Sequence, residues 1–420
     1  MLYKYNLAVI GGKPLCGEVT ISGSKNASFP ILAASLLVDG TVTLQNIPKV
    51  QDIINMLTLF GSMGSKISHV DGNIVEINNA DISIDNMQYD LIGSMRGSIL
   101  ILGALLHRFP EFQLTLPGGC NIGKRPIDFH LDGFRAMGVN ITQQGDVIKF
   151  SRSAKLSSAK IELEYPSVCA TENFMLAGSL AEGTTTIINA ACEPEVVELA
   201  NFLRSMGAKI TGEGTDTINV TGVKQLHATE YKIMPDRIET GTYLAAAAIT
   251  RGKITLKNVD YPSVFEIASQ LIAMGVDITQ QADDIVIDAS AKLQAFDLVT
   301  GPHPEFPTDM QPQFCALNSV ALGESKIIET VFENRLQHIP ELNKMGANLE
   351  RTNNEVYSSG GNILTAAEVE ATDLRAAAAL LLAGLAAKGE TIIKNAHYLS
   401  RGYESVFSKL SNLGATLRYL

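Results

Sequence analysis

The chain has 420 residues, of which 46% are hydrophobic and 18% charged, and its formal net charge is −11. Such a length suits two or three domains with large apolar cores, while the negative charge argues against a general binder of nucleic acid or membrane surfaces. The five cysteines are scattered and form no CxxC pair, so we expect no disulfide framework, no zinc site and a cytoplasmic protein.

One pattern is repeated six times along the chain. In each copy a helix ends at a Met-Gly or Leu-Gly pair and a strand-like stretch follows. Subtracting positions gives spacings of 74, 69, 68, 71 and 68 residues between Gly64, Gly138, Gly207, Gly275, Gly346 and Gly414. A glycine just past a helix supplies the left-handed conformation that ends it. Upstream of each pair lies an apolar, alanine-rich segment, such as 26–44 or 375–393, which predicts a helix buried on all sides.

Each repeat is predicted to contain a strand, a buried helix, a strand, an amphipathic helix and two further strands. Six repeats predict an α/β protein of two inside-out, barrel-like domains, each with three repeats, helices inside and sheets outside. We expect the first domain over residues 25–234 and the second over 1–24 and 235–420. The N-terminal strand has no helix of its own, so we expect it to pair with the last repeat, which would give the domains two crossovers.

Polar and charged residues open the six buried helices. In chain order they are Lys25 and Asn26, Arg96, Thr171 and Glu172, Arg237 and Glu239, Asp309, and Asp373 with Arg375. If the helices are parallel within a domain, their N-termini converge and favour phosphates and carboxylates. Helix caps and local ion pairs are the alternative explanation, which suits Thr171 and Glu239. It suits the cations poorly, because positive charge is unfavourable at a helix start.

The stretch "LPGGCNIGKRP", residues 116–126, places Cys120 between glycines and close to Lys124 and Arg125. Nearby cations lower a thiol pKa, which is typical of reactive cysteines. A glycine turn with an incidental cysteine is the alternative. The chain contains no GxxxxGK[ST], GxGxxG, HExxH or GxSxG motif, so P-loop nucleotide binding, hydride transfer, metal hydrolysis and serine hydrolysis lose support.

Several separate stretches fall in order along the chain: "GEVTISGSKNASFPILAA", "SMRGSILILGALL", "LPGGCNIGKRPIDFH", "MPDRIETGTYLAAA", "HPEFPTDMQPQF", "ETVFENR", "ATDLRAAAAL" and "SRGYE". From Gly17 to the C-terminus they resemble the enolpyruvyl transferase family, in particular the members that act on UDP-N-acetylglucosamine. The resemblance implies the two-domain fold just described, no metal or organic cofactor, and phosphoenolpyruvate and UDP-N-acetylglucosamine as small-molecule partners. The implied products are the 3-O-enolpyruvyl ether and phosphate, formed by addition and elimination through a tetrahedral intermediate.

The resemblance also implies roles for individual residues. Cys120 matches the general acid and a possible covalent partner of phosphoenolpyruvate, and Asp309 matches the group that hydrogen-bonds the sugar 3-hydroxyl and takes its proton. The cations around the phosphate and carboxylate match Lys25, Arg125 and Arg401. Asn26 matches a polar contact, and Arg96 a cation where the two substrates meet.

Further matches concern the sugar nucleotide. The uridine and diphosphate strip matches Arg125, Pro126, Ile127, Asp128 and Phe129, with a second part at Tyr165, Pro166, Ser167 and Val168. Val331 matches a sugar contact, and Arg335, Asp373 and Arg375 match supporting charges, for which a structural ion-pair role is equally open. Three departures affect nucleotide affinity: Cys169 stands where relatives commonly have glycine, Cys192 where arginine is common, and Tyr165-Pro166 where some members have a lysine-containing pair.

Three alternatives compete with this interpretation. Enolpyruvylshikimate-phosphate synthase shares the fold and the chemistry, but the GGC loop and the RPIDF strip argue against it. A non-catalytic paralogue that senses the sugar nucleotide would be favoured by loss of Cys120, Lys25 or Arg401, and all three are present. A purely structural repeat protein does not explain the cations at the helix starts.

Overall fold

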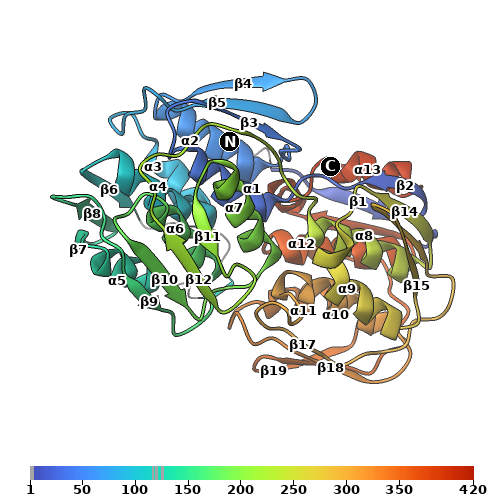
Figure 1. Ribbon diagram of the computed structural model, residues 1–420. Helices are drawn as coiled ribbons and strands as arrows, with labels where there is room; N and C mark the ends of the chain where they lie inside the picture. Colours follow the sequence, from blue (N-terminus) through green and yellow to red (C-terminus); the bar gives the residue numbers. More distant parts are fainter. Residues whose placement is uncertain (1–3, 116–117, 119–121, 124–126) are drawn as a thin grey trace. The chain divides into compact units, whose positions relative to one another are not determined.

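The computed structural model describes residues 4–115, 118, 122–123 and 127–420, which form two domains (Figure 1). The first domain comprises the described residues 23–115, 118 and 127–234. The second comprises the described residues 4–22, 122–123 and 235–420. Apart from the short segment at 122–123, the chain passes between the domains after Ser22 and after Met234. Residues 23 and 24 belong to the first domain, which we expected to begin at residue 25.

The first domain contains three sheets and two kinds of helix. Its helices are α1 (Lys25–Ser35), α2 (Gln51–Ser62), α3 (Tyr89–Ser94), η1 (Arg96–Leu100), α4 (Ile101–Arg108), α5 (Asp128–Ala136), α6 (Val168–Gly178) and α7 (Pro194–Ser205). One sheet has the order β13 (Glu230–Lys232), β3 (Thr41–Gln45), β5 (Ile74–Asn78), β4 (Lys66–Val70). Another has the order β11 (Lys209–Thr211), β12 (Thr217–Thr221), β10 (Thr184–Ile188), β9 (Lys160–Glu162). The third, with three described strands, is β6 (Glu111–Thr115), β8 (Val147–Ser151), β7 (Asn140–Gln144).

The second domain repeats this plan. Its helices are α8 (Arg237–Thr250), α9 (Tyr261–Ala273), η2 (Thr308–Met310), α10 (Gln311–Val320), η3 (Leu336–His338), α11 (Ile339–Lys344), α12 (Leu374–Ala386), η4 (Ala396–Arg401) and α13 (Val406–Asn412). Two sheets have the orders β15 (Asp277–Gln281), β16 (Asp284–Asp288), β14 (Lys253–Lys257), β2 (Cys16–Thr20) and β17 (Leu298–Val299), β18 (Ser325–Ile328), β20 (Glu355–Ser358), β19 (Leu349–Thr352). The third is β21 (Glu368–Glu370), β22 (Glu390–Lys394), β1 (Leu7–Ile10), β23 (Thr416–Tyr419).

The N-terminal strand completes the last repeat, as the sequence predicts. Strand β1 lies between β22 and β23 and is antiparallel to both, so that Ala8 is opposite Ile392 on one side and Arg418 on the other. In the other two sheets of the second domain, the strand at the equivalent position is β16 or β20. Each of these comes from the same repeat as its neighbours and forms a hairpin with the edge strand β15 or β19. Strand β1 therefore holds the C-terminal strand β23 in its sheet.

The predicted arrangement of helices inside and sheets outside is confirmed. Helices α1, α4 and α6 contact one another in the first domain, as do α8, α10 and α12 in the second, and every residue of α8 is buried. Strands such as β3 turn alternate residues, here Val42 and Leu44, toward these helices. Among the described residues the sheets stay separate and form no closed barrel.

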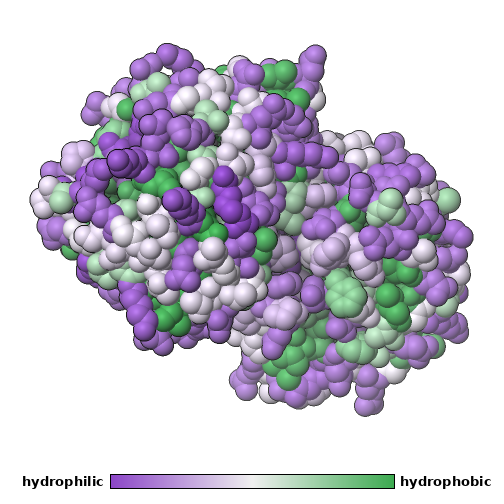
Figure 2. Space-filling view, in the orientation of Figure 1, coloured by the Kyte–Doolittle hydropathy of each residue, from purple (hydrophilic) through white to green (hydrophobic). Residues whose placement is uncertain are grey.

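The glycine that ends each amphipathic helix has the conformation that the sequence predicts. At all six positions φ lies between 86° and 102°, the left-handed region that costs little only for a residue without Cβ. The surface in view is mostly hydrophilic, with apolar residues in small separate groups (Figure 2).

Candidate active site

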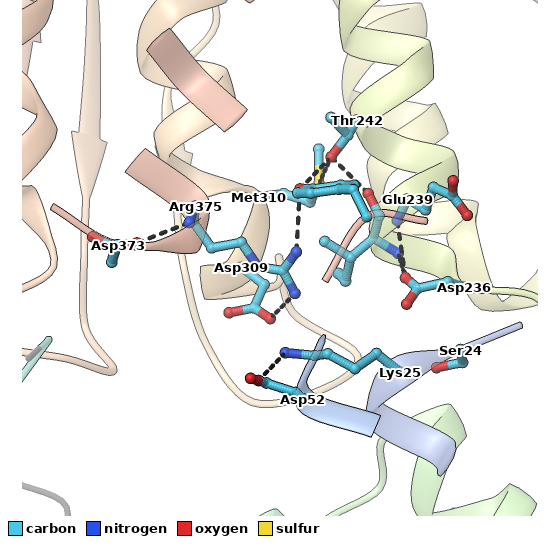
Figure 3. Close-up of polar contacts among 12 residues, drawn as sticks. Ser24, Lys25, Asp52, Asp236, Glu239, Thr242, Asp309, Met310, Asp373 and Arg375 are labelled. Atoms are coloured by element: carbon cyan, nitrogen blue, oxygen red, sulfur yellow. Dashed lines mark hydrogen bonds and ion pairs between the residues drawn. The ribbon is translucent and has the colours of Figure 1, made fainter. Parts of the chain in front are cut away.

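Lys25 is the first residue of α1 and is held in a largely buried position in the first domain. The helix is capped by Ser24, whose Oγ accepts a hydrogen bond from the Ala27 backbone at 3.2 Å. Lys25 Nζ lies 3.8 Å from Asp52 Oδ2, and only 12% and 8% of these side chains are exposed (Figure 3). A cation here opposes the helix dipole, so Asp52, which the sequence analysis did not single out, offsets part of that cost.

Arg96 begins η1, and the neighbouring His130 has a structural role. The Asn173 amide donates to His130 Nδ1 at 2.9 Å and to the Ile99 carbonyl at 3.0 Å, while its oxygen accepts from the Gly103 backbone at 2.8 Å. Burial, and then the charge of Arg96, lower the pKa of His130 to about 3. His130 is therefore neutral at ordinary pH and helps hold α4, α5 and α6 together.

The described part of the predicted nucleotide strip lies at two helix starts of the first domain. Asp128 and Phe129 are the first residues of α5, directly after the buried Ile127. Tyr165 and Pro166 precede α6, which begins at Val168 next to the half-buried Cys169. Tyr165 is exposed.

The cap of α6 is Ser167, whose Oγ accepts from the Ala170 backbone at 3.4 Å. The expectation that Thr171 caps this helix was wrong: Thr171 lies one turn further on, is fully buried, and accepts from the Ala191 backbone at 3.0 Å. Beside it, burial followed by the charges of Glu195 and Glu193 raises the pKa of Glu172 well above its usual value.

Asp309 stands at the centre of a charged cluster in the second domain. Its Oδ1 accepts from Arg335 Nη2 and its Oδ2 from Arg375 Nη2, both at 2.7 Å. The two arginine side chains are 2% and 6% exposed, whereas 27% of the Asp309 side chain is exposed. The carboxylate is thus fixed from behind by two guanidinium groups and keeps an accessible side, which is the arrangement of an oriented hydrogen-bond acceptor.

Arg375 connects this carboxylate to the interior. Burial alone would lower the pKa of its guanidinium, but the charges of Asp309, Tyr403 and Asp236 raise it. Its Nη1 donates to the Tyr403 hydroxyl at 3.1 Å, and its guanidinium carbon lies 5.6 Å from the centre of the Tyr403 ring. Arg375 is the second residue of α12, and Asp309 supplies much of the negative charge that makes a cation favourable there.

The other predicted residues of the second domain have separate environments. Asp373 caps α12 by accepting from the Arg375 and Ala376 backbones at 2.8 and 3.1 Å, so its clearest role is structural. Val331 is half-buried in a loop that Glu329 Oε1 holds through the Val331 backbone at 2.8 Å. Arg401 ends η4 and is half-buried.

Glu239 does not cap α8 but takes part in an ion pair, the other structural role considered for it. The cap is Asp236, which accepts from the Ile238 and Glu239 backbones at 2.8 and 2.9 Å. Glu239 instead accepts from Lys409 Nζ at 2.6 Å and from the Ser22 backbone at 2.8 Å. Glu239 therefore holds Ser22, the last residue of the N-terminal segment that belongs to the second domain.

Cys120, Arg125 and Pro126 lie outside the described residues. Among those that the structure does describe, no three His, Cys, Asp or Glu side chains gather as a metal site. No helix in the described part of the chain has the length and apolarity needed to cross a membrane.

Two comparisons place the chain in a family. The family model described as EPSP synthase (3-phosphoshikimate 1-carboxyvinyltransferase) matches residues 9–410. The structure is also similar to the enolpyruvyl transferase NikO from Streptomyces tendae, with a TM-score of 0.90 and 25% identity over 99% of both chains. The chain belongs to this family of enolpyruvyl transferases.

Within the family, the similarity extends to proteins of one activity. The UDP-N-acetylglucosamine 1-carboxyvinyltransferase of Idiomarina loihiensis is 47% identical over 407 residues, which is 97% of either chain. The protein of the same name from Coxiella burnetii is 46% identical over 98% of this chain and 95% of its own.

Proposed function

We propose that this protein transfers the enolpyruvyl group of phosphoenolpyruvate to the 3-hydroxyl of UDP-N-acetylglucosamine and releases phosphate. The observation that carries the proposal is the 47% identity over 97% of both chains with a transferase of that name. Peptidoglycan precursor synthesis is the process that needs this product, and we expect the reaction to take place in the cytoplasm.

The reaction needs one proton donor, one oriented acceptor and several cations. In the addition step the sugar oxygen bonds to C2 of phosphoenolpyruvate, C3 gains a proton, and the sugar hydroxyl loses its proton. In the elimination step the bond from C2 to the phosphate oxygen breaks and C3 loses a proton, which restores the double bond. Both substrates are anions, so cations must offset their repulsion.

Asp309 is the proposed partner of the sugar hydroxyl. A carboxylate oxygen can accept more than one hydrogen bond, and 27% of the Asp309 side chain is exposed. The two guanidinium groups stabilise the anion, which suits Asp309 to orienting the hydroxyl throughout and accepting its proton as the new bond forms.

The other proposed roles in the reaction belong to several cations and one thiol. Lys25, Arg125 and Arg401 would bind the phosphate and the carboxylate of phosphoenolpyruvate, and Cys120 would deliver the proton to C3. Asn26 and Arg96 would contact the substrates where they meet.

The sugar nucleotide would be bound mainly by residues at the starts of α5 and α6. Asp128 is suited to a uracil N–H, and Phe129 and Tyr165 offer apolar surface to the nucleoside. Val331 would contact the sugar. The remaining proposed contacts of the strip are Arg125, Pro126, Ile127, Pro166, Ser167 and Val168.

The test is phosphate release from phosphoenolpyruvate, measured with UDP-N-acetylglucosamine, with 3-phosphoshikimate and without an acceptor. We expect phosphate release only when UDP-N-acetylglucosamine is the acceptor. Release only with 3-phosphoshikimate would favour the other activity of the family. Tight binding of the sugar nucleotide without any release would favour a non-catalytic sensor.

A further inference from the structure

A row of hydrogen bonds leads from the Asp309 carboxylate into the interior of the second domain (Figure 3). Arg375 donates from Nη2 to Asp309 at 2.7 Å and from Nη1 to the Tyr403 hydroxyl at 3.1 Å. The Tyr403 hydroxyl lies 3.0 Å from Thr242 Oγ1. Thr242 in turn donates to the backbone carbonyl of Ile238 at 2.7 Å. The row therefore ends on the rigid backbone of α8.

The two ends of this row determine the direction of every hydrogen bond in it. Arginine has donors only, so the Tyr403 oxygen must accept from Arg375. The Ile238 carbonyl, at 2.7 Å, is the shortest acceptor for the single hydrogen of the Thr242 hydroxyl, and with that hydrogen donated to Ile238, Thr242 accepts the hydrogen of Tyr403. Each hydroxyl both accepts and donates, and hydrogen bonds in such a series strengthen one another.

The inner part of the row, beyond Asp309, is closed off from water. Tyr403 is 2% exposed, Thr242 is 7% exposed and Gln313 is fully buried. Gln313 Nε2 covers the junction by donating to Thr242 Oγ1 at 3.2 Å and to the Tyr403 hydroxyl at 3.4 Å. If the Tyr403 hydroxyl were removed, water could not easily take its place, and Arg375 Nη1 would lose its acceptor in a buried setting.

We propose that Tyr403 is a positioning residue for the transfer reaction, whose hydroxyl holds Arg375 in the orientation that presents Asp309 to the sugar hydroxyl. This inference rests on the proposed function, and it adds a residue that acts through Arg375 and touches no reacting atom. Arg335 holds Oδ1 of the carboxylate and Arg375 holds Oδ2. A turn of the Arg375 guanidinium therefore rotates the carboxylate, and a displacement of about 1 Å costs up to about 10²-fold in rate.

The molecule contains a matched control for Tyr403. Tyr243 is also 2% exposed, and its hydroxyl has no hydrogen-bond partner within the part of the chain that the structure describes. Tyr403→Phe and Tyr243→Phe remove the same atom from equally buried rings. Thr242→Val removes the acceptor of Tyr403 without touching the ring, and Thr242→Ser keeps that acceptor.

The experiment measures kcat and both KM values for these four variants. We expect Tyr403→Phe and Thr242→Val to lower kcat about tenfold or more with KM values changed less than about twofold, because the lost orientation matters most in the transition state. Tyr243→Phe should behave as the unaltered protein, and Thr242→Ser should restore most of the activity that Thr242→Val loses. In an Asp309→Asn background, Tyr403→Phe should add little, because both changes act through one carboxylate.

Each other outcome would count against the proposal. If the unaltered protein is active and Tyr403→Phe matches Tyr243→Phe in kcat, the inference is wrong and the proposed function stands. The inference would also be wrong if the reduction in kcat in the double variant equalled the product of the reductions caused by Tyr403→Phe and Asp309→Asn alone. If Tyr403→Phe does not fold, equal kcat values of Thr242→Val and Thr242→Ser would be decisive against it. An inactive unaltered protein would overturn the proposed function and this inference with it.

Discussion

Replacing Asp309 by asparagine should impair catalysis and stability by separate mechanisms. The carboxylate offers one oxygen to Arg335 and one to Arg375, each at 2.7 Å. Asparagine keeps a single oxygen, so its NH2 group must face one of the two guanidinium donors. One charge-assisted hydrogen bond is then lost and replaced by an unfavourable donor–donor contact, while the charge that offsets two buried cations disappears.

The size of the stability effect follows from these contacts. A hydrogen bond to a charged group contributes about 1.5–3 kcal/mol, and breaking a fully buried ion pair costs about 3–5 kcal/mol. The Asp309 side chain is 27% exposed, so solvent screens part of the loss, and we expect the free energy of unfolding to fall by about 2 kcal/mol. The catalytic loss should be about 10²-fold or more in kcat, as is usual when an acid–base group is removed.

The matched control is Asp284→Asn. The Asp284 side chain is 28% exposed and pairs with Lys257 Nζ at 2.8 Å on a solvent-facing sheet, where one ion pair contributes little. Urea unfolding, initial rates of phosphate release and calorimetric binding of UDP-N-acetylglucosamine should be measured for both variants. We expect Asp309→Asn to fold, to bind the nucleotide and to turn over slowly. Wild-type turnover in Asp309→Asn would refute the role given to this carboxylate.

Three further predictions concern other groups. Lys25→Met should raise the KM for phosphoenolpyruvate about 10- to 10²-fold by removing a charged hydrogen-bond donor, whereas Lys66→Met, at an exposed ion pair, should not change it; equal effects would exclude a binding role for Lys25. Burial raises the pKa of Glu239 from 4.5 to about 7, so the folded state binds this proton more tightly than the unfolded state does. The contribution of Glu239 to the free energy of unfolding therefore falls by up to about 3 kcal/mol as the pH rises from about 4.5 to about 7. Glu239→Gln should therefore show a shallower decline in unfolding free energy over that range, and an unchanged slope would contradict the shift. An electrophilic phosphonate that mimics phosphoenolpyruvate should alkylate Cys120 and not the exposed Cys16; mass spectrometry that places the adduct on Cys16 would contradict this assignment.

The fold was largely predictable from the sequence because its main requirements are local. A positive φ at Gly64 and the five equivalent positions is a property of single residues that a repeated Met-Gly or Leu-Gly pair reveals. A helix buried on all sides needs an apolar sequence all round, and α8 and α12 have one. The pairing of β1 with the last repeat followed from a strand without a helix of its own.

The cluster around Asp309 was only partly predictable, because its contacts join distant parts of the chain. Asp309 and Arg375 are 66 residues apart and Arg375 and Tyr403 are 28 apart, and no spacing rule relates them. The "SRGYE" stretch contained Tyr403, but its polar partner Thr242 lies on α8 and could be found only from the structure.

Neither Thr171 nor Glu239 caps its helix, and the reason is local. A better cap precedes each of them: Ser167 before α6 and Asp236 before α8. Both were visible in the sequence as polar residues before a helical pattern.

The most direct test of the proposed transfer is mass spectrometry of UDP-N-acetylglucosamine after incubation with phosphoenolpyruvate and the unaltered protein in D2O. If C3 gains a solvent proton in the addition and loses one in the elimination, the sugar nucleotide should gain an enolpyruvyl group that carries deuterium at C3. An unmodified sugar nucleotide would contradict the proposed function, and an enolpyruvyl product without deuterium would contradict the addition–elimination mechanism.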